Sequence, residues 1–183
     1  MVSFKNILFL SLFTLLVSCN GKNPLHQKAK EEVAPKAMGE QLFDFPIEEE
    51  VYVAIYSDIY HRNRDSKVLL TATLSIRNTS RTEKLYIKQV DYFDSTGNLV
   101  RDYLKEPIYL DPLETIDYVI DEEDETGGSG ANFMILWGSE KPIKPVFQAV
   151  MVGGIGSQGI TFTTEGVSVT QKEMISSEKD SIQ

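Results

Sequence analysis

The feature that most constrains this chain is an alternation of apolar and polar residues in its central third. Between Val68 and Val100, apolar side chains recur at every second position, most clearly in the run Leu70, Ala72, Leu74 and Ile76. A period of two is typical of a β-strand with one face in the core and the other in water. Such a strand buries its apolar row only against another layer, so the pattern predicts two packed sheets.

Segments of the same kind occur along most of the chain, separated by turn-forming residues. We expect strands over residues 51–60, 68–78, 85–94, 99–103, 115–121, 131–137, 146–152, 160–164 and 167–170. The run 131–137 is apolar almost throughout, which favours a strand buried on both faces or at the centre of the sandwich, and its Trp137 is expected to fill the core. The segments 68–78 and 85–94 are expected to pair as a central hairpin. Together these strands predict an all-β sandwich.

Composition limits the classes of protein that this chain can represent. Its 183 residues suffice for one ordinary domain, and 25% charged residues indicate a globular protein. The formal net charge of −9 disfavours a nucleic-acid partner, because phosphates are met by clustered Lys and Arg. The single cysteine excludes an internal disulfide.

The N-terminal residues have the pattern of an export signal. Lys5 precedes an apolar run over Ile7–Val17, which is too short to span a bilayer. Leu16-Val17-Ser18-Cys19 resembles the lipobox of bacterial lipoproteins, which implies cleavage before Cys19 and acylation of its thiol, with palmitate as one expected acyl group. Such lipid chains anchor a protein to a membrane without spanning it. The alternative is a chance cysteine beside an ordinary cleavage site.

These patterns divide the chain into four parts. We expect a lipoprotein signal peptide over 1–18, a lipidated N-terminus and flexible linker over 19–46, a β-sandwich domain over 47–170 and a polar tail over 171–183. The localisation expected from this organisation is the bacterial cell envelope, with the body outside the cytoplasm.

A row of aromatic residues provides the candidate partner-binding site. In a strand over 51–60, one face carries three tyrosines and is followed by a basic loop. The candidate contact residues are Tyr52, Tyr56, Tyr60, His61 and Arg62. They could stack on sugar rings or on a partner's side chains. The alternative is structural packing of the tyrosines under a loop or at a sheet edge.

Two glycine-rich segments invite ligand-binding interpretations that the spacing does not support. The segment 121–132 begins with five carboxylates, but the position of a bidentate calcium ligand falls on Phe133. A solvated acidic loop is the preferred interpretation. The run 153–159 contains G-x-G-x-x-G, but it leads into a strand, whereas a dinucleotide site needs a helix there. We interpret it as a hairpin loop, and we expect no cofactor and no metal.

The chain shows no recognisable catalytic set. His61 is the only histidine of the expected body, and no G-x-S-x-G segment occurs. We therefore expect a non-enzymatic binding or structural module for a protein or glycan partner. The alternatives are a carboxylate-dependent hydrolase of envelope polysaccharide, since acidic residues abound, and a calcium-stabilised β-domain.

Several segments together resemble a known family. YSDIYH, LLTATLSIRNT, VDYFDSTGNLVRDYL, LDPLET and TGGSGANF occur in that order over about residues 51–169, and they resemble the bacterial domain-of-unknown-function 3124 family of secreted and lipid-anchored proteins. The resemblance implies no activity and no site residues. More loosely, the order of strands and turns looks like that of small immunoglobulin-like domains, which implies an immunoglobulin-like sandwich of about 7–9 strands.

Overall fold

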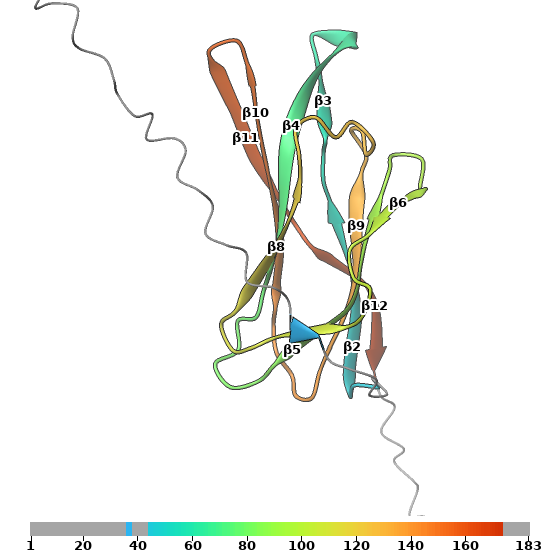
Figure 1. Ribbon diagram of the computed structural model, residues 1–183, viewed down its shortest axis with the longest axis vertical. Coiled ribbons are helices and arrows are strands. Elements are labelled where there is room, and N and C mark those ends of the chain that lie inside the picture. The colour runs from blue at the N-terminus through green and yellow to red at the C-terminus, as the bar shows by residue number, and fades with distance from the viewer. Residues whose placement is uncertain (1–35, 38–43, 174–183) are drawn as a thin grey trace, which may run out of the picture. The chain divides into compact units, whose positions relative to one another are not determined.

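The protein is an all-β sandwich of two antiparallel sheets, as the alternation predicts (Figure 1). The computed structural model describes residues 36–37 and 44–173. The predicted signal peptide, Cys19, most of the predicted linker and most of the predicted tail lie outside these residues. Within the described part, no helix has the length and apolar character needed to cross a membrane.

The first sheet has seven strands. Its order is β1-β7-β5-β9-β2-β12, and β6 pairs with β5. The strands are β1 (Lys36–Ala37), β2 (Ile47–Ala54), β5 (Leu85–Phe93), β6 (Leu99–Asp102), β7 (Ile108–Leu110), β9 (Asn132–Ser139) and β12 (Val167–Glu173).

The second sheet has five strands in the order β11-β10-β4-β3, and β8 also pairs with β4. The long strand β4 pairs with β3 near its start and with β8 near its end. The strands are β3 (Asp58–His61), β4 (Asn63–Arg77), β8 (Thr115–Ile120), β10 (Val146–Ile155) and β11 (Gln158–Glu165).

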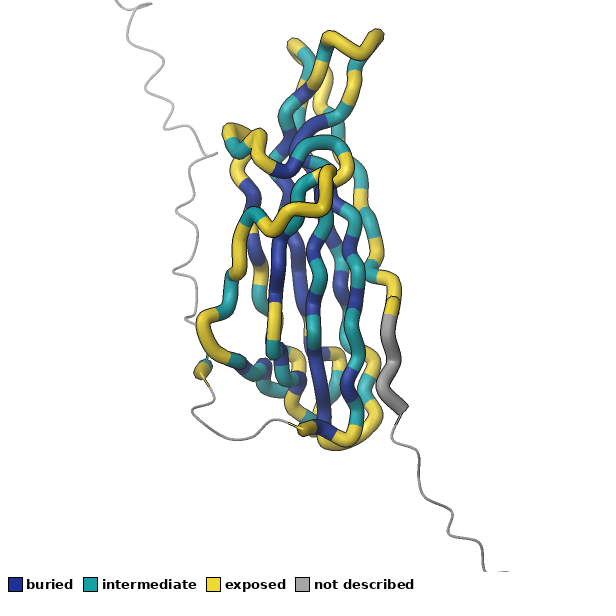
Figure 2. The backbone as a smooth tube through the Cα atoms, turned by 90° about the vertical axis from the view of Figure 1, so that its right-hand side faces the viewer, coloured by how far each residue is buried: buried dark blue, intermediate teal, exposed yellow. Residues whose placement is uncertain are grey.

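The core lies between the sheets and consists of the inward apolar rows (Figure 2). The predicted row on β4 is fully buried: Leu70, Ala72, Leu74 and Ile76 each have 0% exposure. Trp137 is also buried, with its ring centroid 6.2 Å from that of Phe147, which confirms its predicted core position. On β9, burial alternates and the strand lies inside its sheet between β5 and β2, so the central position is observed and full burial of both faces is not.

The chain crosses between the sheets at the end of β2. We expected one strand over residues 51–60, but β2 ends at Ala54 in the first sheet and β3 begins at Asp58 in the second. The expected single strand is therefore wrong. A second crossing joins β11 to β12 at Gly166, where a Cβ would lie 2.7 Å from Val51 Cγ1. Glycine is required there because the two sheets approach so closely.

The expected central hairpin is also wrong. β4 and β5 belong to different sheets, so the connection between them crosses from one layer to the other. Buried Asn78 fixes this crossing, because its side-chain amide donates to the carbonyl oxygens of Glu83, Leu110 and Asp111 at 2.8, 3.2 and 3.1 Å. Alternation alone shows which face of a strand is buried, but it does not show which strand is its neighbour.

Two other turns form as predicted. β5 and β6 are joined by the turn over residues 94–98, in which Gly97 has φ 83°. β10 and β11 pair through Ile155 and Gln158 around a two-residue turn at Gly156 and Ser157. This pairing confirms the hairpin-loop interpretation of the glycine run. Gly156 has φ 60°, which suits a tight hairpin turn.

The strands extend beyond the predicted domain of residues 47–170. Lys36 and Ala37 of the predicted linker pair with β7, and Phe45 is buried with its ring stacked on Tyr86 at 4.3 Å between centroids. At the other end β12 continues to Glu173. The sandwich thus includes short parts of the expected linker and tail.

Candidate functional site

A groove of about 580 Å³ lies at the end of the sandwich where β2 crosses to β3. Three segments that are distant in sequence form it: the β3–β4 hairpin, the β5–β6 turn and the loop between β8 and β9. The lining residues are Asp58, Tyr60, Lys67, Leu69, Asp94, Ser95, Thr96, Glu125, Thr126, Gly127, Gly128 and Ser129. Binding sites of drug-sized ligands commonly have volumes of this order.

One wall of the groove is a single face of the β3–β4 hairpin. Asp58 lies opposite Leu69, and Tyr60 lies opposite Lys67. Side chains of directly opposite residues share one face of a sheet, so these four project into the groove together. Ile59, between them on the strand, projects to the other face and packs against the core.

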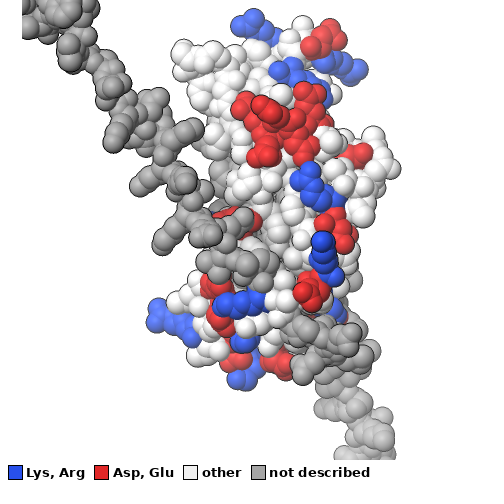
Figure 3. Space-filling model, in the orientation of Figure 1, with Lys and Arg blue, Asp and Glu red and all other residues white. Residues whose placement is uncertain are grey.

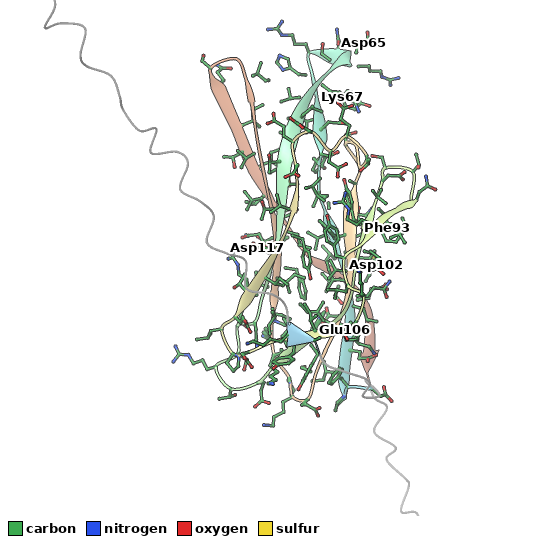
Figure 4. The ribbon with its side chains drawn as sticks, viewed as in Figure 1. Asp65, Lys67, Phe93, Asp102, Glu106 and Asp117 are labelled. Carbon is green, nitrogen blue, oxygen red and sulfur yellow. The ribbon has the colours of Figure 1, made fainter. Side chains whose placement is uncertain are left out.

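Asp58 and Lys67 form an ion pair in this wall. The Lys67 Nζ donates to Asp58 Oδ2 at 2.8 Å, and this hydrogen bond raises the pKa of Lys67. The Asp58 side chain is 5% exposed, whereas that of Lys67 is 41% exposed. The other carboxylate oxygen, Asp58 Oδ1, is buried and accepts no hydrogen bond. Figure 4 labels Lys67 on β4, near Asp65 at the hairpin tip.

Tyr60 forms the outer part of the same wall. Its side chain is the most exposed of the groove's large apolar groups, and the residue is 57% exposed. The Lys67 ammonium lies 5.2 Å from the ring centroid, within the range of a cation–π contact. The wall therefore combines an aromatic surface, an ammonium and a desolvated carboxylate.

Two serines hold the opposite wall in place. Buried Ser57 accepts a hydrogen bond at its Oγ from the Gly128 N–H at 2.7 Å, and its own N–H donates to the Gly128 carbonyl at 3.2 Å. Ser95 donates from its Oγ to the Gly127 carbonyl at 2.9 Å and accepts from the Gly130 N–H at 2.8 Å. These bonds fix the glycine loop between the β2–β3 crossing and the β5–β6 turn.

Glycine is needed in this loop because the loop packs on Tyr92. A Cβ on Gly127 would lie 1.8 Å from the Tyr92 hydroxyl oxygen, and Tyr92 is fully buried. Burial raises the pKa of Tyr92 to about 12, so this hydroxyl stays protonated. Gly128 has φ 78°, a conformation that other residues rarely adopt. Gly127 and Gly128 are thus required for the shape of the wall.

The β5–β6 turn contributes a fixed negative charge. Asp94 Oδ1 accepts from the Asn98 N–H at 2.9 Å and from the Thr96 N–H and hydroxyl at 2.8 Å. These bonds, above all that from the Asn98 backbone, lower the pKa of Asp94 far below its usual value. The carboxylate is therefore ionised at any pH at which the protein is ordinarily studied.

The acidic part of the β8–β9 loop lies directly beside the basic residues of the β3–β4 hairpin (Figure 3). Asp124 is held by Arg101 at 3.1 Å and by Thr126; these contacts, opposed by burial, lower the pKa of Asp124. Glu125 lines the groove and acts electrostatically on Lys67. Among the described residues, no group of three or more His, Cys, Asp and Glu could hold a metal ion.

The residues predicted for partner binding do not form one surface. Tyr60 lines the groove, and His61 and Arg62 follow it at the hairpin tip, where Arg62 has φ 66°. Tyr56 instead packs edge-on against Phe162, with centroids 5.5 Å apart. Tyr52 lies on β2 opposite Val167 and Met134. The crossing after Ala54 separates Tyr52 from the others.

Asp58, Lys67 and Glu125 were not singled out by sequence reasoning. The signal for the first two was present: in a hairpin joined through His61–Asn63, Asp58 and Lys67 fall on the same face as Tyr60. No comparable signal exists for Glu125, because the loop that carries it is placed by distant serines.

The chain thus folds into a two-sheet β-sandwich with a polar groove at one end. The chain belongs to the family described as Protein of unknown function (DUF3124), which it matches over residues 48–169. This match confirms the family resemblance seen in the sequence. A search of curated proteins found no match.

Among solved structures, the chain is similar to one described as "Crystal Structure of Thermotoga maritima 1070". The similarity covers 65% of this chain and 92% of the other, at 16% sequence identity and a TM-score of 0.39.

Proposed function

We propose that this protein is a lipid-anchored, non-enzymatic module of the bacterial cell envelope that binds a glycan in the groove between the β3–β4 hairpin and the β8–β9 loop. The observation that supports it best is the Asp58 carboxylate, which lines the groove, is 5% exposed and has one oxygen without a donor. A buried polar atom without a partner costs free energy, which a ligand hydroxyl relieves by donating to it.

A glycan suits the chemistry of this groove. Carboxylate and carbonyl oxygens accept hydrogen bonds from sugar hydroxyls. The exposed face of Tyr60 offers a stacking surface for a sugar ring, as the sequence suggested for this residue. Because Asp58 Oδ1 is covered in the free protein, a ligand donor reaches it only when the side chain moves.

Binding of oligosaccharides to the protein, measured by calorimetry on a set of envelope-type glycans, tests the proposal. Tyr60→Ala and Asp58→Asn should each weaken binding at least several-fold. Tyr52→Ala is the matched control, because Tyr52 lies outside the groove. Equal binding by the wild-type protein and the three variants contradicts a site in this groove. Capture of a protein in place of any glycan contradicts the ligand class.

The anchor is the second part of the proposal. It rests on Lys5, the apolar run before Ser18, and Cys19 in a lipobox-like context, all outside the described residues. We expect palmitate to label the wild-type chain in cells and membrane fractionation to retain it. Label that persists in a Cys19→Ser variant would contradict this anchor. The immunoglobulin-like connectivity of the sandwich likewise remains a proposal.

A second candidate, a carboxylate-dependent hydrolase, is favoured by one observation: Asp58 and Glu125 line the same groove. Two carboxyl groups flanking a glycosidic bond are the usual requirement for its hydrolysis. Release of reducing ends from envelope polysaccharide, lost in Glu125→Gln, would establish this activity. Binding without release favours the module over the enzyme.

A further inference from the structure

The groove is lined by more acidic than basic side chains. Its lining contains three carboxylates, on Asp58, Asp94 and Glu125, and one ammonium, on Lys67. Asp94 keeps its charge because its turn supplies several donors. The groove therefore carries a net negative charge, which repels polyanionic glycans and attracts cations.

Lys67 is the one basic residue of the groove's lining. Its ammonium bonds to Asp58 at 2.8 Å, feels the Glu125 carboxylate and lies over the Tyr60 ring. These three partners are those that a ligand ammonium would use. Lys67 is carried on a flexible stem and is 41% exposed, so its side chain can extend into water once another cation pairs with Asp58.

Asp58 is the independent sign that a ligand belongs here. Its side chain is more than nine-tenths buried, it lines the groove, and its Oδ1 has no donor while Oδ2 bonds to Lys67. Lys67 reaches Oδ2 alone, so the other carboxylate oxygen is left for a donor of the ligand.

We propose that the groove selects glycans that carry free amino groups, and that the sugar ammonium takes the position of Lys67 beside Asp58, in the groove that Glu125 also lines. This inference rests on the proposed glycan-binding function. The ring that bears the amino group stacks on Tyr60, and the displaced Lys67 side chain extends into water. N-acetylated and anionic glycans lack the ammonium and bind less tightly.

The test compares glucosamine oligomers with N-acetylglucosamine oligomers of equal length, by calorimetry with the full chain. We expect the free-amine oligomer to bind roughly tenfold more tightly, as for one charge-assisted contact in a partly desolvated site. Rising ionic strength should reduce this preference. Glu125→Gln should also reduce it, whereas Glu122→Gln, an exposed acid of the same loop outside the lining, should not.

Lys67→Met should change the affinity for the free-amine oligomer in the direction opposite to Glu125→Gln. If Lys67 competes with the ligand, its removal strengthens binding of the free-amine oligomer several-fold; if Lys67 donates to the sugar, its removal weakens binding. Should this variant fail to fold, Glu125→Gln alone decides. Equal affinity for both oligomers overturns the inference and leaves the glycan function standing, whereas no binding of any glycan overturns the function itself.

Discussion

The two walls of the groove are built in different ways. The β3–β4 wall is a strand pair in which register alone places Asp58, Tyr60 and Lys67 on one face. The opposite wall is irregular backbone, held by hydrogen bonds from Ser57 and Ser95 and shaped by glycines. The hairpin wall therefore tolerates side-chain changes that keep the strand, whereas the loop wall depends on a few small residues.

The largest expected effect is on the loop wall. Gly127→Ala places a methyl group 1.8 Å from the hydroxyl of buried Tyr92, so either the loop or the ring must move. We expect a loss of about 2–3 kcal/mol in the free energy of unfolding. Denaturant unfolding measures it, with Gly159→Ala as control because a Cβ there meets nothing within 4 Å. Equal stability of the two variants would show that the loop does not rest on Tyr92.

The hairpin wall should respond unequally to loss of its two charges. Lys67→Met leaves the buried Asp58 without its cation and should cost about 1–2 kcal/mol, a value reduced for the exposure of the lysine. Asp58→Asn leaves only a solvated ammonium and should cost less than about 1 kcal/mol. Thermal unfolding of both variants checks the order, and the reverse order would show that Asp58 is not the desolvated partner.

The two serines of the loop wall should also contribute unequally to the free energy of unfolding, and the more buried one should contribute more. Ser57→Ala removes a buried acceptor and should cost about 1–1.5 kcal/mol, whereas Ser95→Ala, at an exposed position, should cost about half as much. Hydrogen exchange separates them: the Gly128 amide should lose protection in the first variant and the Gly130 amide in the second. A uniform loss of protection across the loop would contradict two independent contacts.

The smallest effect concerns the turn at Asp94 and depends on pH. The folded pKa of Asp94 is lowered, so its contribution to stability is present above the unfolded pKa of about 3.9 and is lost as the pH falls below it. Asp94→Ala should lower the melting temperature by a few degrees at neutral pH. In scans at decreasing pH this difference should shrink below about pH 4. A difference independent of pH would mean that the ionised carboxylate is not the stabilising group.

The faces of the strands were more predictable from the sequence than their partners. The apolar row of β4 lies inward as expected, because burial of one face follows directly from the period of two; its residues are Leu70, Ala72, Leu74 and Ile76. After Arg77 the chain crosses to the other sheet and does not form a hairpin. This crossing depends on the hydrogen bonds of Asn78 to Leu110 and Asp111, which are far away in sequence.

The groove was predictable only in its hairpin half. Tyr60 was a candidate from its place in the tyrosine row, and the same alternation places Asp58 and Lys67 beside it once the β3–β4 turn is known. The loop half was not predictable, since the contact between Ser57 and Gly128 joins residues 71 positions apart. The acidic run 121–125 drew attention as a group, but only Glu125 of it lines the groove.

The direction of β2 determines how the molecule carries mechanical force. Ile47 starts β2 beside Ser139 and Glu173, at the end of the sandwich away from the groove, and Ile55, just after β2, bonds to Ala131 near the groove (Figure 1). Tension between Ile47 and a molecule held on Asp58 and Tyr60 acts along the backbone of β2, which leads directly into β3. Tension between Ile47 and Glu173 separates β2 from β12 by breaking one residue pair after another from that end. The same sandwich thus resists the first pull far better than the second.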